Sequence, residues 1–305
     1  MRRMKKNIFK ASSNKSLLAR TISRCFPLFM IPTVAAFCIG FVWPFIQGIY
    51  LSFCDFMIPS DATFVGLENY IKAFADEGFR YSFFYTSAFA VVSIIAINVL
   101  AFTVAYCLTQ DIQGANIFRT VFFMPNLIGG IVLGYIWSMI FDGVLKLYDT
   151  FLLAETKYGF WGLLILMCWQ QIGYMMIIYI AGLQSIPEDM LEAARIDGAT
   201  KWQTLWKVTI PNMMSSFTIC IFLTLTNSFK LFDQNLALTN GMPVIFEENT
   251  MINSTQMMAL NIFQTFYGTG STRGVAQAKA VIFFILVAVL ALAQLKLTRE
   301  KEVQQ

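Results

Sequence analysis

The sequence predicts an all-α, polytopic membrane protein with six transmembrane helices, and its composition and charge distribution support this fold class. Of the 305 residues, 57% are hydrophobic and 13% are charged, whereas a soluble domain is charged at about a quarter of its positions. The charges cluster in connectors, as expected if an isolated charge at mid-bilayer costs about 2.5–3.5 kcal/mol. Five charge-free runs exceed the roughly 20 residues of a span, and a sixth does so if it starts near Val275. These runs are 25–54, 81–110, 120–141, 158–187, 208–229 and 280–295.

The predicted elements differ in their breaks and connectors. Proline and glycine in the first and third runs predict kinks and close helix packing; they are Pro27, Pro32, Pro44, Pro125, Gly129, Gly130 and Gly134. The connector at 55–80 contains a short amphipathic helix within 64–79. The longest connector, 230–274, has the spacing of a helix at Met257, Leu260, Ile262 and Phe266. That helix either lies at the membrane interface or forms a docking platform for an outside partner.

The distribution of basic residues predicts the orientation. Fifteen of the 22 Lys and Arg residues fall in the two tails and in the second and fourth connectors. The positive-inside rule therefore places both termini in the cytoplasm. The apolar run after the basic N-terminus is too long for a signal-peptide core, so we expect a retained first helix. The expected organisation is a basic cytoplasmic tail at 1–24, one six-helix domain at 25–296 and a cytoplasmic tail at 297–305.

Composition also argues against several functions. The chain has no histidine, and its six cysteines lie in or at the ends of apolar runs without a Cys-x-x-Cys pair. We therefore expect no metal site, no cofactor and no hydrolytic triad. No phosphate-binding loop of the G-x-x-x-x-G-K-[ST] type occurs, and the spans leave no room for a soluble catalytic domain. We expect neither an enzyme nor a nucleic-acid-binding protein.

The segment 184–211 is the most polar interior part of the chain. Pro187 and the acids that follow it predict a helix N-terminus, and Gly198 supplies the left-handed residue that ends that helix. A second helix carries Trp202, Leu205 and Trp206 on one face. The segment is thus a rigid elbow at the cytoplasmic surface, or an amphipathic connector resting on lipid headgroups.

The stretch "EAARIDGATKWQTLWKVTIP", residues 192–211, resembles the EAA loop of ABC importer permeases, in which EAA is followed after three residues by Gly. Ile210 stands where leucine is common. Similarity continues through residues 51–56, 64–70, 118–128, 181–199 and 232–243 and points to the carbohydrate branch, of maltose or multiple-sugar type. Met242 departs from the usual Gly-Gly-Pro of the last segment.

The resemblance implies a type I ABC importer permease in a bacterial cell membrane. It implies a second permease subunit, two ATPase subunits that bind the ATP, and an extracellular or periplasmic sugar-binding protein as partners. The coupling loop, 184–211, would dock on the ATPase. The residues assigned to coupling are Glu192, Ala193, Ala194, Asp197 and Gly198.

Polar residues in the fourth and fifth predicted spans form the second candidate site. Gln171 and Tyr174 are three residues apart, and a stripe on the fifth span contains Ser216, Cys220, Thr224, Asn227 and Ser228. Such groups avoid hydrocarbon, so the stripe either forms hydrogen bonds between helices or lines a water-filled pathway. Matching positions in sugar importers indicate substrate contacts by Gln171, Tyr174, Thr224 and Ser228, and the stripe alone adds Asn227.

The absence of a cation in these two spans favours a neutral sugar over glycerol-3-phosphate or a related polar solute. A stand-alone carrier or channel would explain six spans equally well. It would leave the elbow unexplained, and it would require ionisable residues inside the spans.

Overall fold

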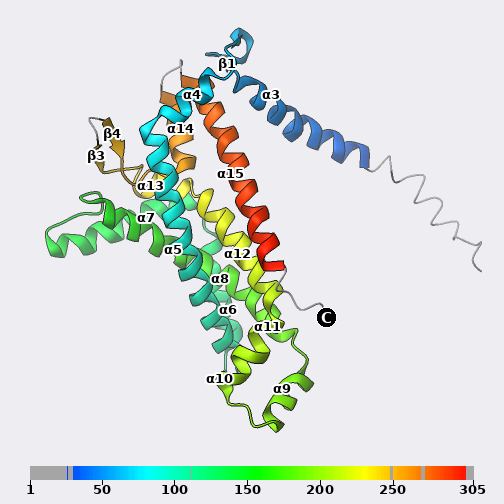
Figure 1. The fold of residues 1–305 in the computed structure, drawn as a ribbon. Helices are drawn as coiled ribbons and strands as arrows, with labels where there is room; N and C mark the ends of the chain where they lie inside the picture. The colour runs from blue at the N-terminus through cyan, green and yellow to red at the C-terminus, as the bar shows by residue number, and fades with distance from the viewer. Residues whose placement is uncertain (1–25, 27–29, 111, 248–249, 269–271, 300–305) are drawn as a thin grey trace, which may run out of the picture.

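The computed structural model describes residues 26, 30–110, 112–247, 250–268 and 272–299, and the described chain is a helical bundle with two small hairpins (Figure 1). The elements of its first part are η1 (Cys38–Val42), α3 (Trp43–Leu51), β1 (Cys54–Asp55), η2 (Pro59–Asp61), β2 (Thr63–Phe64), α4 (Glu68–Ala75), α5 (Glu77–Leu108), α6 (Ala115–Phe123), η3 (Met124–Leu127), α7 (Gly130–Leu145) and η4 (Lys146–Tyr148).

The second part of the chain supplies the centre of the bundle. Its elements are α8 (Thr156–Gln184), α9 (Glu188–Ile196), α10 (Lys201–Thr204), η5 (Leu205–Thr209), α11 (Ile210–Asn212), α12 (Met214–Phe229), α13 (Asp233–Leu238), β3 (Val244–Glu247), β4 (Thr250–Asn253), α14 (Met258–Gly268) and α15 (Arg273–Arg299).

The described helices are long and apolar enough to cross a membrane five times, or six times if one bent pair forms a single span. The five are Met30–Leu51, Glu77–Leu108, Gly130–Tyr148, Thr156–Gln184 and Arg273–Thr298. The bent pair joins Lys201–Asn212 to Met214–Phe229 at 70°. The predicted six-span, all-helical fold is confirmed, and the protein passes through a membrane several times.

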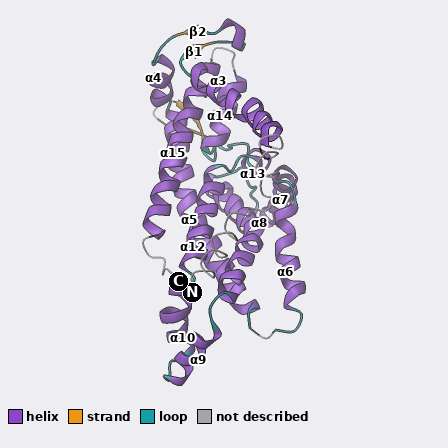
Figure 2. Cartoon of the chain, turned by 90° about the vertical axis from the view of Figure 1, so that its right-hand side faces the viewer, coloured by secondary structure: helices purple, strands orange, loops and turns teal. Residues whose placement is uncertain are grey.

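The two ends of the bundle carry different connectors. β1, β2 and α4 lie at one end in both views, and α9 and α10 lie at the other (Figures 1 and 2). We call these the β1 end and the α9 end. The hairpin of β3 and β4 is antiparallel, with Val244 opposite Asn253.

The core lies between α5, α8 and α12. Side chains that are fully buried there include Phe89, Ile97, Leu163, Met175 and Tyr179, and the ring of Tyr179 lies 4.9 Å from that of Phe217. Met30–Leu51 is different, because it extends away from the bundle in Figure 1 and is almost entirely exposed. It meets α15 through Phe45 and Phe284, whose ring centroids are 5.1 Å apart.

The third predicted span is broken where its proline and glycine residues predicted a kink. The chain leaves α6, makes the 3-10 turn η3 with Pro125 in its first turn, and starts α7 after the extended residue Gly129. A Cβ atom at Gly134 would lie 2.5 Å from the Cβ of Ala237 in α13. The predicted close packing is therefore present, but it joins α7 to α13.

The helices expected in the two longer connectors at the β1 end are both present, with narrower bounds. The first is α4, in which Asn69 and Ala73 are buried. The second is α14, where Met258 and Leu260 are buried against the bundle. Because α14 packs on α5 and α15, it is a structural part of the bundle and does not lie free at an interface.

Candidate functional site

The predicted coupling loop forms two helices joined by a turn. Glu188 and Asp189 occupy the first turn of α9, where acidic side chains stabilise the helix dipole. Gly198 ends α9 with φ +77°, and the amide of Ala199 donates to the carbonyl oxygen of Ala194 at 3.0 Å. This is the predicted left-handed C-terminal turn, which a residue with a Cβ atom adopts only with strain.

The turn leads directly into the second helix. Thr200 accepts a hydrogen bond from the amide of Gln203 at 3.3 Å, and the Gln203 side chain accepts one from the amide of Thr200 at 2.8 Å. This reciprocal cap fixes the start of α10. Trp202 and Trp206 follow one turn apart with ring centroids 5.6 Å apart, and both are exposed. The two predicted helices and the left-handed turn between them are therefore present.

The two faces of α9 have different surroundings. Leu191 packs against the main core, and the preceding Ile186 is buried in it. On the other face Glu192 and Ala193 are exposed, and Ile196 is 85% exposed. Of the remaining predicted coupling residues, Asp197 and Gly198 are exposed and Ala194 is half-buried. A Cβ atom at Gly198 would meet nothing within 4 Å, so within this chain the glycine serves the turn and not a close contact.

Part of the predicted stripe on α12 is a seam between helices. Thr224 and Ser228 are fully buried. The Ser228 hydroxyl lies 2.8 Å from the Ser93 hydroxyl of α5, and Thr224 accepts from Asn98 Nδ2 at 3.3 Å. Asn98 in turn accepts from the Tyr179 hydroxyl at 2.7 Å. In this conformation these hydroxyls bond α5, α8 and α12 together, which is one of the two alternatives that the sequence left open.

Ser216 and Cys220 extend the same seam. The Cys220 thiol donates to the carbonyl oxygen of Met175 at 3.8 Å, and a Cβ atom at Gly182 would lie 2.2 Å from the Ser216 hydroxyl. The side chains of α12 and the backbone of α8 therefore meet closely along the line that the spacing of the polar residues marks.

Gln171, Tyr174 and Asn227 have a different setting. All three are half-buried, and Asn227 Nδ2 donates to Gln171 Oε1 at 3.3 Å between α12 and α8. Among the described residues the Tyr174 hydroxyl has no hydrogen-bond partner. These groups keep unused hydrogen-bond donors and acceptors, so they can bind a polar solute. Thr224 and Ser228 cannot do so in this conformation, because they are buried and already hydrogen-bonded.

Two further amides pair with each other between α8 and α13. Gln170 Nε2 donates to the carbonyl oxygen of Ile128 at 3.2 Å, and its Oε1 accepts from Gln234 Nε2 at 2.6 Å. Gln170 was visible in the sequence beside Gln171, whereas Gln234 lies beyond the fifth predicted span. Only the return of α13 toward α8 brings it here, and the spacing of residues carries no signal for that contact.

Comparison with known proteins decides the family. The model of the binding-protein-dependent transport system inner membrane component family matches residues 113–301. The chain belongs to this family. The matched range covers both candidate sites, from η3 through the predicted coupling loop to α15.

Similar proteins support the assignment over nearly the full length. The probable starch degradation products transport system permease protein AmyD of Thermoanaerobacterium thermosulfurigenes is 44% identical over 91% of this chain and 94% of its own. The multiple sugar-binding transport system permease protein MsmF of Streptococcus mutans is 29% identical over 90% and 95%.

Solved structures show the same fold. A chain of a bacterial ABC transporter involved in the import of the acidic polysaccharide alginate has a TM-score of 0.76 at 17% identity and covers 93% of this chain and 99% of its own. At this identity the match concerns the architecture, which is that of an ABC importer permease.

Proposed function

We propose that this protein is the transmembrane permease subunit of an ATP-driven importer of neutral sugars, and that it forms half of the translocation pathway. The observation that carries the proposal is the exposed face of α9, formed by Glu192, Ala193 and Ile196 on a helix anchored by Leu191 and Ile186. A charged and apolar face of this kind, held rigidly outside the bundle, suits a protein partner. The sugar assignment is supported by relatives whose names refer to starch degradation products and multiple sugars.

The coupling loop transmits force from ATP hydrolysis by separate subunits. The loop is continuous with α8 through Ile186 and with α12 through α11, where the chain bends by 70° at Met213. Movement of α9 therefore displaces the ends of the two helices that carry Gln171, Tyr174 and Asn227. Alternating access is a shift between two packings that ATP binding to the partner drives.

The coupling loop lies in the cytoplasm, and both termini lie on the same side of a bacterial cell membrane. The argument is the excess of Lys and Arg in the tails and in the connectors at the α9 end. The β1 end then faces outward and meets a sugar-binding protein, and the apolar surfaces of Met30–Leu51 and α7 face lipid and a second permease subunit.

Gln171, Tyr174 and Asn227 contact the sugar, with Thr224 and Ser228 buried behind them on α12. An aromatic ring stacks on the apolar face of a sugar, and amides pair with its hydroxyls. Apart from the coupling loop, the segment 158–229 contains no Lys or Arg, which disfavours a phosphate ester such as glycerol-3-phosphate as the transported solute.

A charge reversal tests the coupling role. We expect Glu192→Lys to abolish sugar-stimulated ATPase activity and to reduce co-purification of the ATPase at least tenfold. Glu68→Lys is the matched control, because it makes the same change at an exposed residue of α4, at the opposite end of the bundle. Full uptake and full ATPase recovery with Glu192→Lys, or an equal loss with Glu68→Lys, would contradict docking through the outer face.

Uptake of labelled oligosaccharides released from starch tests the pathway. Tyr174→Ala and Asn227→Ala should lower transport at least tenfold while the ATPase still co-purifies. Thr226→Ala is the control, because among the described residues its hydroxyl bonds only to backbone carbonyl oxygens of its own helix. Unchanged uptake in both pathway variants would remove these residues from the pathway.

A further inference from the structure

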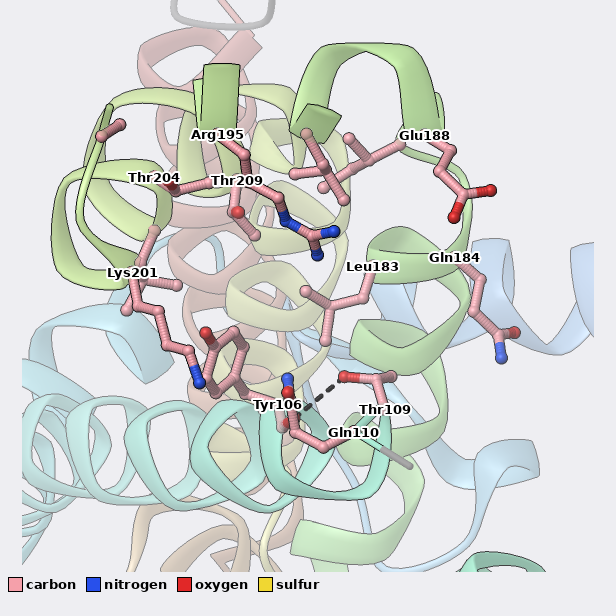
Figure 3. Close-up of a pocket in the computed structure, with 14 residues that line it drawn as sticks. Tyr106, Thr109, Gln110, Leu183, Gln184, Glu188, Arg195, Lys201, Thr204 and Thr209 are labelled. Carbon is pink, nitrogen blue, oxygen red and sulfur yellow. Dashed lines mark hydrogen bonds between the residues drawn. The ribbon is translucent and has the colours of Figure 1, made fainter. Parts of the chain in front are cut away.

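A cavity of about 460 Å³ lies between the coupling loop and the bundle. Its walls come from the end of α5, the end of α8, the inner face of α9, and α10 with η5 (Figure 3). The volume is in the range of pockets that hold small organic ligands, roughly 300–1,000 Å³. The transport proposal makes no use of this space, which lies at the α9 end and outside the amide cluster of Gln171 and Asn227.

Two cations in the cavity lack a counter-charge. Arg195 and Lys201 line it, and neither forms an ion pair or side-chain hydrogen bond with any described residue. In Figure 3 the Arg195 guanidinium points into the space between α9 and Leu183, and the Lys201 amine points toward Tyr106. Both cations line the same cavity from the loop side, and a guanidinium and an ammonium are each suited to a phosphate group.

The opposite side of the cavity offers hydrogen bonds of another kind. Glu188 and Gln184 lie there together, away from Arg195 and Lys201 (Figure 3). A carboxylate accepts hydrogen bonds from hydroxyl groups and repels a second anion. The cavity therefore has one side for a negative group and one side for hydroxyl groups.

We propose that this cavity binds a phosphate group attached to a hydroxylated carbon chain. The phosphate lies against Arg195 and Lys201, and the hydroxyl groups lie against Glu188 and Gln184. This chemistry comes from two sources, a soluble sugar or polyol phosphate and the headgroup of phosphatidylglycerol.

The ligand would connect the coupling loop to the bundle. Arg195 and Lys201 belong to the loop, whereas Tyr106 belongs to α5 and Gln184 to α8. On α9 the cavity residues Glu188, Leu191 and Arg195 share one face, because they are spaced at i, i+3 and i+7. The exposed Ala193 and Ile196 lie away from this face, and Glu192 lies at its edge, one turn after Glu188. The ligand therefore leaves most of the outer face to the ATPase. We expect an occupied cavity to hold the loop against the bundle and to slow transport, a consequence that rests on the proposed function.

Direct binding tests the site. The full-length chain, purified with its accompanying subunits into phosphatidylcholine nanodiscs, is titrated calorimetrically with glycerol 3-phosphate, glucose 6-phosphate, glucose and inorganic phosphate. We expect both organic phosphates to bind, glucose not to bind, and inorganic phosphate to bind at least tenfold more weakly.

A second set of nanodiscs contains phosphatidylglycerol. Loss of soluble-ligand binding there supports the lipid source, and unchanged binding supports the soluble source. No binding of an organic phosphate in either set, together with no retention of phosphatidylglycerol by the protein, overturns the proposal.

Matched variants identify the cations. Arg195→Gln and Lys201→Gln should each weaken binding at least tenfold, whereas Lys207→Gln should not, because Lys207 is exposed on the same segment but does not line the cavity. Equal weakening by all three would indicate general charge attraction and overturn the site. In the Glu188→Gln variant, the affinity for inorganic phosphate should come to within about threefold of the affinity for glycerol 3-phosphate. These titrations measure binding without ATP and without transport. If no ligand binds, the proposed transport function still stands, and if the transport tests fail, the binding results still stand.

Discussion

Lys279 at the β1 end and the two cations Arg195 and Lys201 at the α9 end have opposite surroundings. At the β1 end Lys279 is fully buried (0% exposed), and its Nζ lies 2.5 Å from Asp76 Oδ2, 2.9 Å from Asn261 Oδ1 and 2.8 Å from Thr265 Oγ1. At the α9 end Arg195 and Lys201 face a cavity and have no partner among the described residues. Lys279 fixes a structure, whereas Arg195 and Lys201 remain available.

The free-energy cost of removing a charge from water explains the difference. A charge removed from water destabilises a protein unless partners replace its hydration, and Lys279 has three such partners, one at the start of α5 and two on α14. Asp76 caps α5 through Phe79, and Asn261 and Thr265 belong to α14. The lysine thus joins α5, α14 and α15 at the β1 end. Arg195 and Lys201 keep access to water through the open cavity, which is compatible with a loop that moves relative to the bundle.

The largest effect is expected for Asp76→Asn. The variant keeps an oxygen for the cap of α5 but leaves the Lys279 ammonium buried without its counter-charge. We expect a loss of about 3 kcal/mol in the free energy of unfolding, at the lower end for a broken buried pair because the Asp76 side chain is 39% exposed. Thermal or denaturant unfolding in detergent measures it.

A double variant separates the charge from the cap. Asp76→Asn combined with Lys279→Met removes both members of the pair and should recover at least half of the loss, since no buried charge remains. Arg195→Gln is the comparison from the α9 end, and we expect it to leave the unfolding midpoint unchanged. Equal destabilisation by Asp76→Asn and Arg195→Gln would contradict the contrast between the two ends.

A smaller effect is expected at the turn of the coupling loop. Gly198→Ala forces an alanine into φ +77°, which costs about 1–2 kcal/mol. Gly143→Ala is the matched control, because Gly143 lies within α7 with nothing within 4 Å of an added Cβ atom, and there alanine should stabilise the helix by about 0.5–1 kcal/mol.

Hydrogen exchange measures both changes locally. Gly198→Ala should increase amide exchange in 189–197 several-fold while leaving α8 unchanged, and Gly143→Ala should slow exchange in α7. If alanine at 198 left exchange in α9 unaffected, the elbow would not depend on this turn.

The sequence predicted what local rules determine. Charge-free runs marked the spans, and Pro187 and Gly198 marked the ends of α9, because capping and left-handed turns depend on a few neighbouring residues. Helical spacing also placed Trp202 and Trp206 on one face, where their rings meet. These elements match the structure closely because no distant contact is needed to specify them.

The sequence could not predict contacts between distant segments. Ser93 and Ser228 are 135 residues apart, so the polar stripe on α12 did not show whether it faced α5 or a pathway. The break after α6 was signalled by Pro125, but the course of α7 depends on its packing against α13. Lys279 lies within α15, but its partners lie on two other elements, which spacing along one helix does not reveal.

The smallest effect is expected at an ion pair that is exposed. Lys72 Nζ lies 2.7 Å from Glu68 Oε1 on α4, a distance close to that of the Lys279 pair, but both side chains are more than half exposed. Water already solvates these charges and salt screens them, so we expect Lys72→Gln to leave the unfolding midpoint within experimental error at physiological salt. Measured beside Asp76→Asn, it tests whether burial or distance decides the strength of a pair. A loss with Lys72→Gln comparable to that with Asp76→Asn would mean that distance decides, and the contrast between buried and solvated charges would then no longer explain the two ends of this molecule.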